Sequence, residues 1–232
     1  GVETMPQTAE NVATQFNINR ADQDQFALSS QQRTAAAQAR GFFDKEIIPV
    51  TIPQRKGEPV VIAQDEHPRA TTIEALTQLK PVVKAEGSVT AGNASGINDG
   101  AAALLIASDD AIEKYGLKAR AKIIGATTVG VEPRIMDFAP APAIKKLLAQ
   151  TGLTLEQMDV IELNEAFAAQ ALAVTRDLGL ADGAEHVNPN GGAIALGHPL
   201  GASGARLVTT ALNQLEATGG TYALCSMCIG VG

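Results

Sequence analysis

The chain has 232 residues, 45% of them hydrophobic and 19% charged, which is ordinary for a globular protein able to bury a sizeable core. Its net charge of −7 argues against a general nucleic-acid-binding surface, although a few local basic residues could still hold a phosphorylated ligand. No apolar run approaches the roughly 20 residues that span a membrane, and the few histidines and cysteines predict no metal site.

The first part of the chain is polar and mixed. Residues 19–40 are rich in Ala and Gln at helical spacing, and Gly41 is a plausible stop. Residues 47–52 and 60–63 are predicted strands on either side of the turn-forming sequence R-K-G-E-P. The sequence T-T-I-E resembles a capping box and predicts a short helix over 71–79.

From residue 89 onward, strands and helices alternate. The run A-A-A-L-L-I-A at 101–107 is typical of a strand buried on both faces, and a helix is predicted over 109–115. Further strands are predicted over 121–128, 160–163 and 222–226, and further helices over 141–150, 165–178 and 201–217. This alternation predicts an α/β sheet covered by helices. We expect burial in parallel or mixed strands for Leu104, Leu105, Ile106, Val160 and Ile161.

The most informative stretch is 188–204, N-P-N-G-G-A-I-A-L-G-H-P-L-G-A-S-G, which surrounds His198. Dense glycines allow backbone N–H groups to approach a ligand, and an imidazole can exchange a proton near neutral pH. Composition alone favours a Gly-rich loop whose histidine caps a helix. A second unusual element, the sequence C-I-G-V-G that begins at Cys228, favours chemistry instead.

The two cysteines, Cys225 and Cys228, form C-S-M-C near the end of the chain. A redox C-x-x-C motif is expected to open a helix, whereas this one ends an apolar run and enters glycines. Cys225 suits a buried, apolar thiol. Cys228 is the acid/base candidate, and nearby donors could lower the pKa of its thiol enough for proton transfer at neutral pH.

Four motifs in order resemble those of the thiolase family: G-N-A-S-G-I-N-D-G at 92–100, N-E-A-F-A at 164–168, the Gly-rich stretch around His198, and C-x-G-x-G. The likeness covers essentially the whole chain and implies an α/β fold of αβαβα layers. It also implies a partial loop domain at 1–96, a remnant strand and helix of the first half at 97–119, and a second half at 120–232 without its final strand. The start of the first half, with the cysteine that family members acylate, would then be missing.

The resemblance also assigns catalytic roles. His198 would activate the missing nucleophile and bind the thioester oxygen, and Cys228 would be the acid/base for carbon–carbon cleavage. The N–H of Gly230 would contribute to an oxyanion hole, and Asn164 would hold a water that completes the second one with His198. Read without the family, Asn164 is a helix N-cap and Cys228 a buried thiol.

Coenzyme A would be a substrate rather than a cofactor, and no other cofactor is implied. By resemblance, Arg69 would contact its nucleotide part and Ser95 its pantetheine amide. Ala166 and Phe167 would line the acyl or pantetheine channel, and Met136 would lie in the substrate pocket. Without the family, Phe167 and Met136 would be assigned to the core.

The function predicted is therefore acetyl-CoA C-acyltransfer on a 3-ketoacyl-CoA, with overall likeness greatest to the 3-oxoadipyl-CoA branch. An acetoacetyl-CoA-forming acetyl-CoA acetyltransferase and a non-catalytic acyl-CoA-binding module remain alternatives. Decarboxylating condensing enzymes carry a second His or an Asn where Cys228 stands, so the thiol favours a thiolase. We expect a cytoplasmic homo-oligomer, a dimer or tetramer, with acyl-CoA and CoA as ligands and no nucleic-acid or membrane partner.

Overall fold

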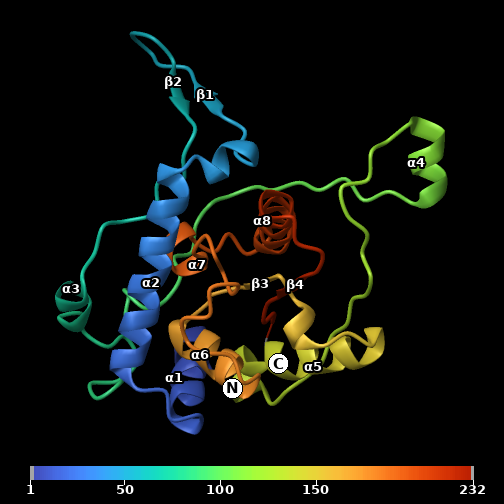
Figure 1. Cartoon of the computed structure of the whole chain (residues 1–232). Coiled ribbons are helices and arrows are strands. Elements are labelled where there is room, and N and C mark those ends of the chain that lie inside the picture. Colours follow the sequence, from blue (N-terminus) through green and yellow to red (C-terminus); the bar gives the residue numbers. More distant parts are fainter. Residues whose placement is uncertain (1–2, 231–232) are drawn as a thin grey trace.

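Two parallel strands form the centre of the molecule, and the computed structural model describes residues 3–230 (Figure 1). β3 (Val160–Leu163) lies beside β4 (Ala223–Ser226), with Val160 opposite Ala223 and Leu163 opposite Ser226. All four residues of β3 are buried. The predictions of a buried strand at 160–163 and of an α/β fold are confirmed. The strand is buried because helices cover both faces of this pair and exclude water from it.

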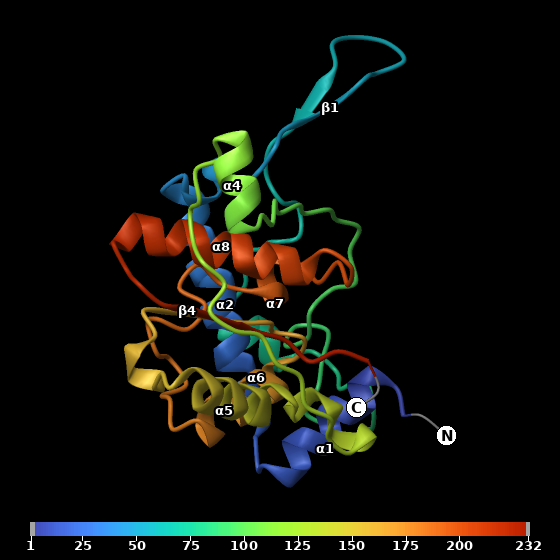
Figure 2. The ribbon, with the colours of Figure 1, turned by 90° about the vertical axis from the view of Figure 1, so that its right-hand side faces the viewer.

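Helices form a layer on each side of β3 and β4. Figure 2 shows α8 (Ser203–Thr218) along one face and α5 (Pro140–Thr151) and α6 (Ala168–Asp177) along the other. The main core lies between the strands and the second pair of helices, and it contains Ala141, Ile144, Met158, Ile161, Leu163, Ala171, Val174, Val187 and Leu224.

Two longer helices pack against α6 from the outside. α1 (Met5–Gln15), which the sequence pattern did not predict, contributes Val12 and Ala13 to a second buried cluster. α2 (Arg20–Ala39) begins at Asn19, whose side chain accepts a hydrogen bond from the backbone N–H of Asp22. It ends just before Gly41, which has a φ of +69°. The predicted helix at 19–40 is therefore confirmed together with its stop at Gly41, whereas the cap at Asn19 was not predicted.

The remaining elements are short. They are α3 (Ile73–Thr77), α4 (Asp109–Tyr115), α7 (Ala193–Leu196), and the 3₁₀ turns η1 (Phe42–Lys45), η2 (Pro133–Phe138) and η3 (Leu155–Gln157). Strands β1 (Val50–Ile52) and β2 (Val60–Ile62) form an antiparallel hairpin that projects away from the body (Figure 1). No helix within residues 3–230 is long and apolar enough to cross a membrane.

Two predicted strands are wrong for this chain. Residues 101–107 and 121–128 are extended but unpaired, and their large side chains face outward. Leu105 is 81% exposed and Ile106 68% exposed, and Leu104 is also exposed. A strand needs a neighbour for its backbone hydrogen bonds, and no strand of the described residues lies alongside either segment. An apolar run indicates that burial would be favourable, but it does not specify the neighbouring strand that burial in a sheet requires.

Substitution at matched buried and exposed isoleucines tests this core. Ile161 is 1% exposed, so Ile161→Ala is expected to lower the free energy of unfolding by about 2–5 kcal/mol through lost burial and a residual cavity. Ile123 is 67% exposed, so Ile123→Ala is expected to change that energy by no more than about 0.5 kcal/mol. Urea denaturation of the 232-residue chain measures both, and equal effects would contradict this core assignment.

Candidate active site

Asn164 directly follows the last residue of β3, and its side chain contacts the ring of His198. Its backbone N–H donates to the carbonyl of Ser226 at 2.9 Å and so extends the pairing of β3 with β4 by one residue. Its side-chain Nδ2 lies 3.4 Å from His198 Nε2. The interpretation of Asn164 as an N-cap is wrong, because α6 begins four residues later, at Ala168, with Phe167 in the cap position. Asn164 Oδ1 is buried and has no hydrogen-bond partner among the described residues.

His198 is held on both sides by hydrogen bonds. Its backbone N–H donates to the Gly96 carbonyl at 2.9 Å, and its ring Nδ1 lies 2.6 Å from Ser203 Oγ. The Ser203 hydroxyl in turn donates to the carbonyl of Pro199 at 3.1 Å. Asn164 Nδ2 can only donate, so Nε2 is the acceptor and the ring proton is assigned to Nδ1, where Ser203 Oγ accepts it. Nε2 therefore carries the lone pair of the ring, directed at Asn164.

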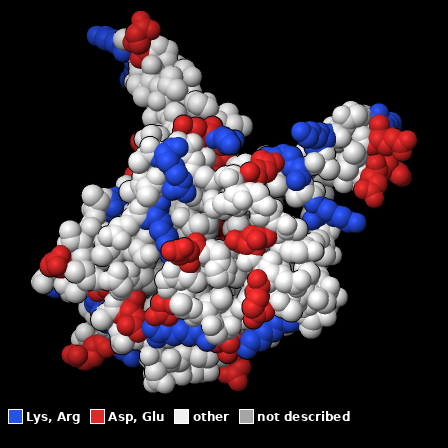
Figure 3. All heavy atoms as spheres, in the orientation of Figure 1, with Lys and Arg blue, Asp and Glu red and all other residues white. Residues whose placement is uncertain are grey.

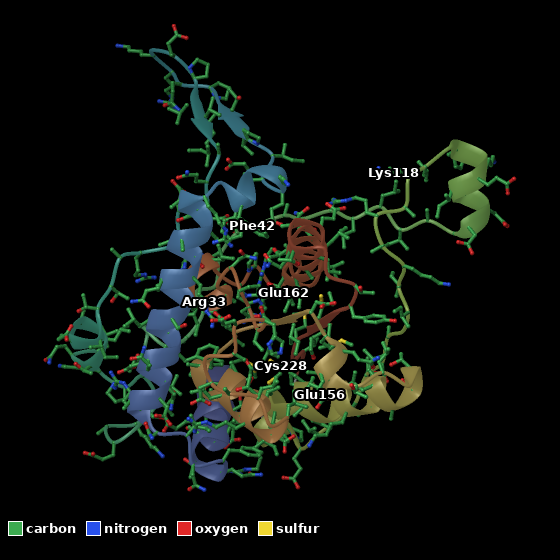
Figure 4. The ribbon with its side chains drawn as sticks, in the orientation of Figure 1. Arg33, Phe42, Lys118, Glu156, Glu162 and Cys228 are labelled. Carbon is green, nitrogen blue, oxygen red and sulfur yellow. The ribbon has the colours of Figure 1, made fainter. Side chains whose placement is uncertain are left out.

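The surroundings of His198 favour the unprotonated imidazole that a general base needs. Burial lowers the pKa of this imidazole, and the positive charge of Arg206 lowers it further. Arg206 itself reaches from α8 to the fully buried Glu162 at 3.3 Å, and burial raises the pKa of Glu162 to about 8. Glu162 lies under α8 (Figure 4). The ring of His198 is therefore neutral at neutral pH.

Close backbone packing, rather than ligand contact, explains several glycines around His198. A Cβ on Gly197, which has a φ of +94°, would collide with the side chain of Asn98. A Cβ on Gly100 would lie 2.7 Å from Pro199 Cγ. At Gly197 and Gly100 the missing side chain leaves room for a side chain of the other segment, Asn98 in the first case and Pro199 in the second. Our interpretation of these glycines as room for a ligand gains no support from this packing.

Glu165 and Asn188 attach the histidine loop, residues 188–198, to the end of β3. The Glu165 carboxylate accepts hydrogen bonds from Ser30 Oγ at 2.6 Å, Asn188 Nδ2 at 2.8 Å and the backbone N–H of Ile194 at 3.2 Å. The Asn188 side chain also donates to the carbonyl of Leu163 and accepts from its N–H, both at 2.8 Å. The Asn188 amide thus substitutes for a neighbouring strand. Burial raises the pKa of Glu165, and its hydrogen bonds oppose that rise.

Cys228 lies two residues beyond β4 and is 7% exposed. It packs with Met136 and Ala166 in a small apolar cluster, and Figure 4 shows it on the side of the sheet away from α8. Burial raises the pKa of its thiol, and the negative charge of Asp137, whose Oδ1 is 3.7 Å from Sγ, raises it further. The expectation that nearby donors lower this pKa is therefore wrong. A protonated thiol is suited to act as an acid.

The assignment of the more buried thiol to Cys225 is also wrong. Cys225 lies on β4 and is half-buried, whereas Cys228 is buried. Burial raises the pKa of Cys225 to about 12, and the charge of Glu162 contributes to that rise. The difference arises because Cys228 turns into the cluster with Met136, while Cys225 stays within the short strand.

The segment around Ser95 lies alongside the start of α6. Both the backbone N–H and the hydroxyl of Ser95 donate to the carbonyl of Ala166 at 3.0 Å, and Ala94 forms a β-bridge with Phe167. Since Gly96 next to Ser95 binds His198, the structure brings Ser95, Ala166 and half-buried Phe167 to the Asn164–His198 pair.

Arg69 Nη2 lies 3.4 Å from the ring of His67, whose Nδ1 lies 2.8 Å from the carbonyl of Ala195, three residues before His198. Arg69 is exposed beside an open hollow of about 310 Å³ against α2, lined also by Gln31, Gln32, Ala35, Gln38, Pro68, Ala70 and Thr71. Gly230 is exposed with a φ of +79°, and the last two residues of the C-x-G-x-G motif lie outside the described part of the chain. Within the described part, no group of three or more possible ligands could hold a metal ion.

Sequence reasoning missed two groups that contact the candidate catalytic side chains. Ser203 lies in the same Gly-rich motif, five residues after His198, so a hydroxyl this close in sequence to the imidazole was a usable signal. Asp137 had no local signal. It reaches Cys228 from η2, across 91 residues of sequence.

Comparison with known proteins identifies the family. The model of the thiolase C-terminal domain matches residues 117–232, and that of the thiolase N-terminal domain matches residues 2–110. A beta-ketoadipyl-CoA thiolase of Acinetobacter baylyi is 82% identical over all of this chain, which spans 58% of that relative's length.

Two solved structures show the same fold. The acetyl-CoA acetyltransferase of Bacillus anthracis superimposes with a TM-score of 0.94 at 45% identity, over 99% of this chain and 58% of that one. Human mitochondrial 3-ketoacyl-CoA thiolase in complex with CoA superimposes with a TM-score of 0.88 at 44% identity, over 98% of this chain and 56% of that one.

Titration of His198 tests the electrostatics of the site. In an NMR pH titration its ring resonance, identified by its loss in His198→Gln, is expected to have a midpoint below the usual pKa of about 6.5. Because the folded state favours the neutral ring, this group's contribution to stability is complete above about pH 6.5 and is lost as the pH falls through the folded pKa. A midpoint at or above that of a free imidazole would contradict the burial argument.

Proposed function

The chain belongs to the thiolase family, and we propose that the protein containing it cleaves a 3-ketoacyl-CoA with CoA to acetyl-CoA and a shortened acyl-CoA. The same site would catalyse the reverse Claisen condensation. The observation that carries this proposal is the contact of Asn164 with the unprotonated Nε2 of His198, beside the cluster that contains Cys228. A base, an acid and hydrogen-bond donors are what this chemistry needs.

His198 would act first. Its neutral Nε2 takes the proton from a nucleophilic cysteine thiol, which we place in the part of the relatives' length that this chain does not span. The thiolate attacks the ketone carbon of the substrate. The resulting imidazolium and the Asn164 amide are then placed to stabilise negative oxygen, and the unpartnered Oδ1 of Asn164 could bind a water there.

Cys228 would act in the carbon–carbon step. As that bond breaks, the leaving carbanion takes the thiol proton of Cys228 and becomes the methyl group of acetyl-CoA. An incoming CoA thiol gives its proton to the Cys228 thiolate and attacks the acyl-enzyme. The nucleophilic cysteine leaves as a thiolate and takes back its proton from the His198 imidazolium, which restores all three groups. The raised pKa of the buried thiol supports its role as the acid. In this proposal Gly230 supplies an oxyanion-hole donor.

The substrate proposed is 3-oxoadipyl-CoA. The support is the 82% identical relative, which carries the name beta-ketoadipyl-CoA thiolase. Acetoacetyl-CoA is the second candidate, supported by the structural likeness to an acetyl-CoA acetyltransferase at the lower identity of 45%. A non-catalytic module is disfavoured, because Asn164, His198 and Cys228 are all retained and their neighbours hold them in place.

Binding of CoA would use two regions: the hollow beside α2 and the surface near the Asn164–His198 pair. We propose that Arg69 and the hollow beside α2 receive the nucleotide end, and that Ser95, Ala166, Phe167 and Met136 line the path of the pantetheine and acyl groups. A related human thiolase was determined in complex with CoA, which supports this ligand. We further propose that the chain divides into 1–96, 97–119 and 120–232.

A homo-oligomer is also proposed, on the strength of the β1–β2 hairpin. The register places Val50 opposite Ile62 and Ile52 opposite Val60, so these four apolar side chains share one face of the hairpin. Val50 is 58% exposed and Val60 45% exposed. Figure 3 shows charged side chains at the tip of the hairpin and few along its sides. Such a face is normally covered by a partner, and a second copy of the protein is the partner proposed.

Catalysis is tested in the full-length protein by replacing the two proposed acid/base groups. His198→Ala removes nucleophile activation and an oxyanion donor, and is expected to slow thiolysis by at least about 10²–10³-fold. Cys228→Ser is expected to retain acylation by acetyl-CoA but to block carbon–carbon cleavage, because a hydroxyl is a far weaker acid. Acylation is followed by mass spectrometry, and thiolysis by loss of 3-oxoadipyl-CoA or acetoacetyl-CoA.

Cys225→Ser is the matched control for these variants, because Cys225 makes none of the contacts assigned to the site. It is expected to leave thiolysis within about twofold of the unsubstituted protein. Normal thiolysis in Cys228→Ser would show that Cys228 is a structural thiol. Absence of thiolysis in the unsubstituted full-length protein would reject the proposed function.

Assembly is tested by placing a charge on each face of the hairpin. Val60→Asp, on the apolar face, is expected to lower the molar mass of the full-length protein in light scattering toward that of a monomer. Thr51→Asp introduces the same charge on the opposite face, beside Val61, and is expected to have a smaller effect. An unchanged molar mass for Val60→Asp over a dilution series would show that this face is not the interface.

A further inference from the structure

Asp137 is a buried carboxyl group that the proposed mechanism leaves without a task. It lies on η2 directly after Met136 and is 1% exposed. Its Oδ2 accepts a hydrogen bond from Thr8 Oγ1 of α1 at 2.8 Å, and its Oδ1 lies 3.7 Å from the Sγ of Cys228. Each carboxylate oxygen is thus directed at a different part of the chain, and one of them at the candidate acid.

We propose that Asp137 is a positioning residue that acts through Cys228, by accepting the thiol hydrogen on Oδ1 and so holding the thiol protonated and in one orientation. This inference rests on the proposed function. When Cys228 gives its proton to the substrate carbanion, a thiolate and a carboxylate are left about a hydrogen-bond length apart. Their repulsion favours return of a proton to sulfur from the incoming CoA thiol, so the pair ends each cycle as it began.

Thr8 and Cys228 are the two side chains that contact the Asp137 carboxylate, one at each oxygen. Burial raises the pKa of Asp137 to about 6, and the hydrogen bonds from Thr8 and Cys228 oppose that rise. The charged groups on the elements that pack against η2 bind elsewhere: Glu10 to the backbone of Ser88 and Val89, Lys145 to Asp177, Lys146 to the carbonyl of Thr128, and Arg176 to Asp22 and Asp182. Asp137 is therefore ionised at neutral pH and takes up a proton in mildly acidic solution.

The test measures the ionisation of the Cys228 thiol in the full-length protein. The rate of alkylation by iodoacetamide is followed over a pH series, and mass spectrometry of the peptide containing Cys228 separates it from other thiols. Asp137→Asn keeps the shape of the side chain and removes its charge. It is expected to lower the pH midpoint for alkylation of Cys228 by about one unit or more.

Thr8→Val and Asp159→Asn complete the design. Thr8→Val removes the hydrogen bond to Asp137 Oδ2 but leaves the carboxylate charge beside the thiol, so the alkylation midpoint of Cys228 is not expected to fall. Asp159→Asn makes the same chemical change at the other end of the sheet, where the carboxylate binds the backbone of Thr221 and Tyr222. It is expected to leave the Cys228 midpoint in place.

An unchanged midpoint in Asp137→Asn, or an equal shift in Asp159→Asn, would overturn the proposal. A purely structural role for Asp137 would lower protein yield or reactivity at every pH without moving the midpoint. If Asp137→Asn does not fold, a fall in the Cys228 alkylation midpoint in Thr8→Val, where the carboxylate charge is kept, overturns the proposal by itself. Alkylation needs no turnover, so an inactive full-length protein would reject the proposed function while the shift in midpoint could still be read.

Discussion

The parallel pairing of β3 with β4 is the constraint on which the rest of the structure depends. Parallel strands end at the same edge of a sheet, so Asn164 after β3 and Cys228 after β4 emerge on one side. The bridge between Ile161 and Val187 brings a third segment to the same edge, and Asn188 fastens it there. That segment leads to His198. One local pattern of backbone hydrogen bonds thus gathers groups that are far apart in the sequence.

Local signals in the sequence predicted features that depend only on neighbouring residues, such as the end of a helix. Gly41 marked the end of α2, and the apolar run at 160–163 marked a buried strand. The run at 101–107 has the same apolar character and is exposed, because burial in a sheet depends on a neighbouring strand that no local pattern encodes. The start of α6 was predicted too early because the Asn164 side chain is turned toward His198 rather than toward the helix.

In the candidate site, too, the sequence predicted which residues take part but not the contacts they make with distant segments. The resemblance to family motifs predicted roles for Asn164, His198 and Cys228. The structure places Asn164 against His198, and Cys228 in the cluster with Ala166. The pKa of Cys228 was predicted in the wrong direction, because the glycines after it suggested exposure to donors. Its actual surroundings are apolar side chains and the carboxylate of Asp137, which comes from a distant segment. Long-range contacts of this kind decide charge states, and composition does not reveal them.

The close packing of two glycine-rich segments has a consequence for how such proteins can diverge. Gly96 binds the backbone of His198, Asn98 fills the space that a side chain on Gly197 would need, and Gly100 lies against Pro199. The segment at 96–100 is therefore shaped to the histidine loop of its own chain. Recombination with a relative at a crossover between these segments would join surfaces that had not varied together, so the two segments are expected to be inherited as a unit.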